Sequence, residues 1–92
     1  MIIYAEIECF LYNGHSLKQK RSIVKSIIMK VRQDFNVSIS EIDYQDLWHR
    51  TKMGVAIVCN DYVFGERVIQ EIFKVFDANP ELERTITTVD RL

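Results

Sequence analysis

The chain opens with an alternation of two kinds of side chain. From residue 3 to residue 12 one face carries Ile, Ala, Ile, Cys and Leu, and the other carries Tyr, Glu, Glu, Phe and Tyr. A period of two residues is typical of a strand with one buried face. The period returns over residues 37–43, and residues 53–59 form a nearly continuous apolar run, which predicts two further strands. A last strand, rich in Thr and Ile, is predicted at about residues 83–89.

Two segments between these strands have the period of a helix. Apolar residues recur at helical spacing over residues 17–35, and Ser16 with Gln19 forms an S-x-x-Q capping box just before them. A second apolar stripe follows Asn60 and Asp61, either of which can cap a helix that ends before the single proline of the chain.

The predicted order of elements is therefore β-α-β-β-α-β, an α+β arrangement of the ferredoxin-like type. We expect a four-stranded antiparallel sheet in strand order 4-1-3-2, with both helices on one face, as a single domain over residues 1–92. This topology brings three connections to the same end of the sheet: residues 13–16, residues 44–51 and the turn near Pro80.

Length and composition add an expectation about assembly. A chain of 92 residues with 48% hydrophobic and 27% charged residues can bury one modest core, and burial of a further face by association would stabilise it. We therefore expect a homo-oligomer, most simply a dimer. The start, MIIYAEIECFLY, carries acidic residues and lacks the features of a signal or spanning segment. A cytoplasmic protein with no membrane partner is expected.

The two cysteines are predicted to be reduced. Cys9 and Cys59 fall late in neighbouring antiparallel strands, with about five residues of offset at roughly 3.3 Å each. That separation exceeds what a disulfide tolerates. Neither thiol is expected to act as a nucleophile.

Charge is distributed unevenly along the chain. The net charge is −1, but residues 13–36 carry +5 and the remainder carries −6. Four cations of the first helix share one stripe beside its apolar face, and free N–H groups at the helix start favour anions. The segment is thus a candidate anion or nucleic-acid site, although a solvated helix face would also explain it. The candidate residues are His15, Ser16, Lys18, Arg21, Lys25 and Arg32.

Lys20 falls near the buried side of the same helix, where an amine must reach water or find an acid. The connection predicted to lie beside it contains Asp43 and Asp46. We expect these three residues to form an ion-pair cluster, in which case part of the basic segment is structural.

No pattern predicts catalysis. His15 and His49 lack the spacing of metal ligands, and Trp48 is expected to cover the end of the core. The loop NGHSLKQKR lacks the glycine pattern with which acylphosphatase binds phosphate, and the RNP motif of RNA-recognition folds is absent. Glu6 and Glu8 separate the aromatic residues on the second face of the first strand, so that face suits another subunit better than phosphate. We predict no catalytic residue, no metal site and no cofactor, and favour a binding role over an enzymatic one.

Three segments, GHSLKQKRSIVKSI, FNVSISEIDYQDLWHR and MGVAIVCND, resemble in order and spacing the bacterial YlxP-like proteins, a family described as being of unknown function. The resemblance covers almost the whole chain. It implies a ferredoxin-like α+β fold and a gene setting often near translation initiation factor two and ribosome-binding factor A, with no established activity. The matching positions are His15, Ser16, Leu17, Lys18, Lys20, Arg21, Lys25, Glu41, Asp43, Gln45, Asp46, Leu47 and Trp48.

Two functions follow as hypotheses. The first is a non-enzymatic binding module that contacts RNA, a ribosomal subunit or another partner in ribosome assembly or translation through the basic start of the first helix. The alternative is a structural or regulatory homodimer, with an internal ion-pair cluster and an open sheet face that binds protein.

Overall fold

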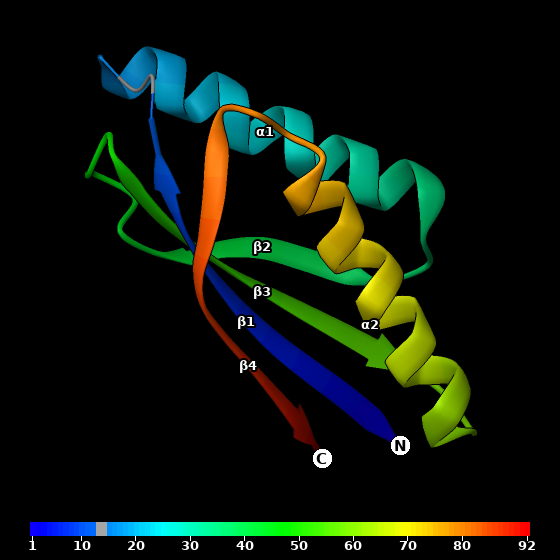
Figure 1. Ribbon diagram of the computed structural model, residues 1–92. Helices are drawn as coiled ribbons and strands as arrows, with labels where there is room; N and C mark the ends of the chain where they lie inside the picture. Colours follow the sequence, from blue (N-terminus) through cyan, green and yellow to red (C-terminus); the bar gives the residue numbers. More distant parts are fainter. Residues whose placement is uncertain (13–14) are drawn as a thin grey trace.

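The computed structural model describes residues 1–12 and 15–92. Its four strands form one antiparallel sheet in the order β2-β3-β1-β4, and both helices lie on the same face of that sheet (Figure 1). Read from the other edge, this is the predicted order, so the ferredoxin-like α+β prediction is confirmed. The elements are β1 (Ile2–Leu11), α1 (Leu17–Asp34), β2 (Ser38–Asp43), β3 (Arg50–Val58), α2 (Tyr62–Asp77) and β4 (Leu82–Arg91).

The core lies between the sheet and the helices. The apolar face of β1 is fully buried there, and α1 and α2 each contribute one apolar stripe. At Gly65 of α2 a methyl group would clash with Ile3 Cδ1, so the missing side chain lets this helix approach the sheet closely. Within the described residues, neither helix is long and apolar enough to cross a membrane.

Both helices begin with the caps that the sequence predicts. Ser16 Oγ accepts from the backbone N–H of Gln19 at 3.1 Å, and Gln19 Oε1 accepts from the backbone N–H of His15 at 3.0 Å. The capping box is thus confirmed, with Gln19 reaching one residue before the cap. Asp61 caps α2 by accepting from the N–H of Val63 at 3.1 Å.

The predicted convergence of connections is also present. The N–H of Leu11 donates to the carbonyl of His49 at 2.9 Å, and the N–H of Tyr12 donates to the carbonyl of Glu81 at 3.1 Å. The end of β1 therefore touches both the β2–β3 connection and the turn after α2. Residues 13 and 14, which belong to the third expected connection, lie outside the described residues.

The cysteines are unbonded, as predicted. Cys9 is opposite Thr51 in the β1–β3 pairing, whereas Cys59 lies beyond the other end of β3. Burial raises the pKa of the Cys9 thiol to about 12, so this group stays protonated near neutral pH.

Candidate anion-binding site

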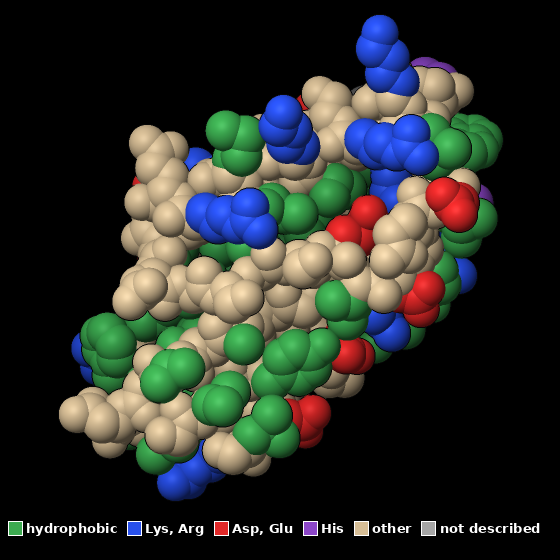
Figure 2. All heavy atoms as spheres, turned by 180° about the vertical axis from the view of Figure 1, so that it is seen from behind, with side chains coloured by type: hydrophobic (Ala, Val, Ile, Leu, Met, Phe, Trp, Pro, Cys, Tyr) green, Lys and Arg blue, Asp and Glu red, His purple; other side chains and the backbone are tan. Residues whose placement is uncertain are grey.

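Four exposed cations of α1 form what we call the cationic stripe: Lys18, Arg21, Lys25 and Arg32. The stripe faces the edge strand β2, because Arg32 Nη2 donates to the carbonyl of Ile39 at 3.1 Å. Figure 2 shows Lys and Arg side chains gathered along this helix. At 1.5 Å of rise per residue, the stripe is about 21 Å long.

The stripe lies outside the internal ion pairs of the described residues. Those pairs involve Lys20, Lys30, Arg50, Lys52, Lys74 and Arg84. Lys30, on another side of α1, pairs with Asp34 at 2.9 Å. The positive charge of the stripe is therefore not neutralised by a carboxylate within the described part of the molecule.

The start of α1 is less open to an anion than the sequence predicts. The hydroxyl of Ser16 and the backbone N–H of His15 are both used in the capping box. The first turn of α1 carries no acidic residue to balance the positive helix end. The candidate site is thus centred on the four side chains of the stripe, with the two capping residues in a structural role.

Lys20 is buried and forms an ion pair, as expected, but its partner is Glu41 and not Asp43 or Asp46. Its ammonium is fully buried, contacts Glu41 Oε2 at 2.7 Å, and donates to the carbonyls of Tyr44 at 2.7 Å and Gln45 at 3.2 Å. Asp43 and Asp46, the expected partners, are exposed. Lys20 therefore ties the first turns of α1 to β2 and to the start of the β2–β3 connection.

Strand geometry explains why Lys20 pairs with Glu41 and not with Asp43. Glu41 follows the buried Ile39 by two residues, so both side chains face the helices. Between Glu41 and Asp43 the pairing of β2 with β3 shifts register, and Asp43 Oδ1 instead accepts from the backbone N–H of Tyr44 at 2.7 Å. The alternation of β2 was enough to predict that Glu41 faces the helices, whereas the register shift that turns Asp43 away was not visible in the sequence.

The open face of the sheet holds a polar network that the sequence did not reveal. Arg50 Nη2 donates to Glu8 Oε2 at 2.9 Å, and this hydrogen bond lowers the pKa of Glu8. Lys52 lies 3.8 Å from Glu6 Oε1. Tyr44, whose φ is 62°, places its ring 4.0 Å from the Arg50 guanidinium carbon. Both acids that were expected to repel phosphate are therefore balanced by cations of β3.

Four aromatic rings form a row where β1 meets the β2–β3 connection, which we call the ring set: Tyr12, Phe10, His49 and Trp48. Neighbouring ring centroids are 5.2, 6.4 and 5.6 Å apart, in edge-to-face contacts. Trp48 is 47% exposed and Tyr12 is 55% exposed. The expectation that Trp48 covers the core is therefore wrong, because this side chain presents its ring to solvent.

Comparison with known proteins gives the chain a family. Residues 2–89 match the family model described as "Protein of unknown function (DUF503)". The chain belongs to the DUF503 family. It is 48% identical over 90 residues to the "Uncharacterized protein YlxP" of Bacillus subtilis (strain 168), with 98% of each chain covered. The resemblance to YlxP-like proteins is thus confirmed, and these descriptions name no activity.

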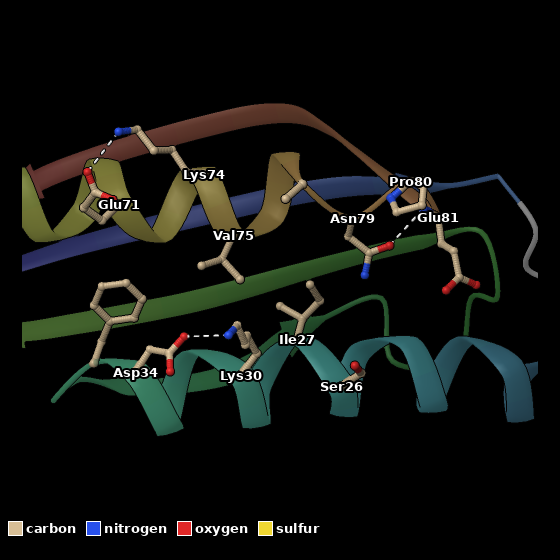
Figure 3. A pocket seen from close by; sticks show the side chains of 12 residues that line it. Ser26, Ile27, Lys30, Asp34, Glu71, Lys74, Val75, Asn79, Pro80 and Glu81 are labelled. Carbon is tan, nitrogen blue, oxygen red and sulfur yellow. Dashed lines mark hydrogen bonds and ion pairs between the residues drawn. The ribbon is translucent and has the colours of Figure 1, made fainter.

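This DUF503 chain also has a hollow between α1 and α2. Figure 3 shows Ile27 and Val75 facing it from the two helices. Both cations that line the hollow are paired, Lys30 with Asp34 and Lys74 with Glu71, each at 2.9 Å. The hollow therefore offers no unpaired cation to an anion, and the stripe is the better candidate site.

Proposed function

We propose that this protein is a non-enzymatic RNA-binding module whose cationic stripe contacts the phosphate backbone. The observation that carries the proposal is the contrast between the two groups of cations. Six Lys and Arg side chains of the described residues form ion pairs, while all four members of the stripe stay outside them. Arg67 and Arg91 are also outside these pairs, but they lie singly on α2 and β4, so the stripe is where such cations gather. A row of uncompensated cations attracts a polyanion.

The physical basis of such binding is the release of counterions. Each phosphate that a Lys or Arg neutralises frees cations condensed on the nucleic acid, so affinity falls as salt rises. The stripe extends for about 21 Å along one rigid helix, which suits a chain of phosphates better than a single small anion. The gene setting implied by the YlxP-like resemblance supports a partner in ribosome assembly or translation.

Salt dependence tests the proposal. The probe is a labelled RNA hairpin with a single-stranded tail, which offers both duplex and single-stranded phosphates. If four cations each neutralise one phosphate, log Kd should rise with log salt concentration with a slope of about 3 to 4. A slope near zero, or no binding at low salt, would contradict the proposal.

Self-association through the open sheet face is a second candidate. Val58 is 82% exposed, and its partner in the β1–β3 register, Ile2, is 41% exposed. This apolar pair lies away from the polar network of Glu8 and Arg50, and its burial between two copies would stabilise a dimer. Sedimentation equilibrium at micromolar concentration should give the mass of a dimer, and the monomer mass of 10.9 kDa throughout would remove this candidate.

A further inference from the structure

The ring set is an exposed aromatic surface that the cationic stripe does not explain. Tyr12, Phe10, His49 and Trp48 follow one another in edge-to-face contact, and Trp48 leaves 47% of its surface to solvent. Edge-to-face packing of one ring on the next holds the row in place. Such rings are suited to stacking flat apolar groups.

The ring set and the stripe begin at the same end of the sheet, with Phe10 on the open face and α1 on the other face. Lys20 holds the carbonyls of Tyr44 and Gln45, which places the connection that contains Trp48 beside the first turns of α1. Lys18 and Arg21 flank Lys20 in that helix. In Figure 2, hydrophobic side chains lie next to Lys and Arg side chains where this helix begins.

We infer that the RNA is bound as a single strand that passes around this end of the sheet, with its backbone along the cationic stripe and the bases nearest the start of α1 stacked on the ring set. This inference rests on the proposed function and names the form of RNA that the site accepts. In a duplex the bases already stack on one another, so they cannot reach a row of protein rings. In a single strand the bases are free, and positively charged tracks with aromatic platforms are the usual way to hold it.

Acidic residues near the rings determine which part of the RNA can face them. Asp43 at the end of β2 and Asp46 in the β2–β3 connection are exposed, and Glu83 accepts from the Tyr12 hydroxyl at 2.6 Å. These carboxylates repel phosphate, so the backbone stays on the side of α1 and only bases face the rings. Asp46→Asn should therefore tighten RNA binding. If the ring set instead serves a basic peptide, Asp46→Asn should weaken the binding of that peptide.

The tryptophan itself provides the measurement. Trp48 is the single tryptophan of the chain, so its fluorescence reports directly on the ring set. The probes are an oligoadenylate of about 12 nucleotides, within the site sizes of known single-strand binders, and its duplex with oligouridylate. The single strand should quench the fluorescence and bind about tenfold more tightly than the duplex.

A variant isolates the stacking contribution. Trp48→Ala should lower the affinity for labelled oligoadenylate by about tenfold, as measured by anisotropy, and leave duplex binding unchanged. Phe64→Ala is the matched control, because Phe64 is also exposed, at 56%, and lies in α2 beyond the opposite end of β3.

The outcomes separate the two claims. If neither RNA binds at low salt, the proposed function fails and the inference fails with it. If both RNAs bind equally and Trp48→Ala has no effect, the inference is overturned while the proposed function stands.

Discussion

Glu41→Leu is expected to lower the free energy of unfolding by about 3–5 kcal/mol, the largest loss we foresee for a single substitution outside the apolar core. The substitution would leave the fully buried ammonium of Lys20 with the carbonyls of Tyr44 and Gln45 but without a countercharge. It would also remove the acceptor of the Thr51 hydroxyl, now 2.6 Å from Glu41 Oε2. Urea denaturation of the purified variant measures the loss.

Two further variants make this result specific. Lys20→Met combined with Glu41→Leu should cost less than the sum of the two single changes, because an apolar pair leaves no charge buried without a partner. Asp43→Asn should stay within about 0.5 kcal/mol of the parent, since Asp43 is exposed and an amide oxygen can still accept from the N–H of Tyr44. A Glu41→Leu variant as stable as the parent would show that the buried pair does not hold α1 to β2.

Local patterns were enough to predict the elements of the fold. The period of two marked β1, and the spacing of apolar residues together with the Ser16 capping box marked α1. Chain topology then fixed which connections meet and kept the two thiols apart. These features depend on neighbours in sequence or on strand order alone, which is why the sequence contained them.

The side-chain partners could not be predicted in the same way, because they depend on register. Whether Lys20 meets Glu41 or Asp43 is decided by a shift of one residue where β2 pairs with β3. The balance of charge on the open face likewise requires Glu8 to lie opposite Lys52 and next to Arg50. No periodicity in a single sequence records such a pairing.

The exposed position of Trp48 escaped prediction for a related reason. The β2–β3 connection turns at Tyr44, where φ is 62°, and its carbonyls are held by Lys20. This turn carries the indole to the surface instead of over the core. A Tyr at a left-handed position gives no signal in a sequence, because Gly or Asn is the usual residue there.

Lys18→Gln combined with Arg21→Gln is expected to weaken RNA binding by between about 10- and 100-fold at low salt. Each change removes one phosphate contact from the exposed stripe, and each contact contributes roughly a factor of ten near 0.1 M salt. Both side chains are exposed and lie outside the ion pairs of the described residues, so stability should change little.

A second double variant controls for net charge. Lys30→Gln combined with Lys74→Gln also removes two positive charges, but from side chains that are paired with Asp34 and Glu71. These cations lie beside the hollow between the helices and outside the stripe. RNA affinity should therefore change by less than about threefold, because only the overall electrostatic potential of the protein changes.

The ratio of the dissociation constants of these two double variants, for the same labelled RNA hairpin at the same low salt, tests the central claim most directly. The stripe variant should bind at least several-fold more weakly than the control variant. Equal affinities would show that the cationic stripe is not the RNA-binding surface.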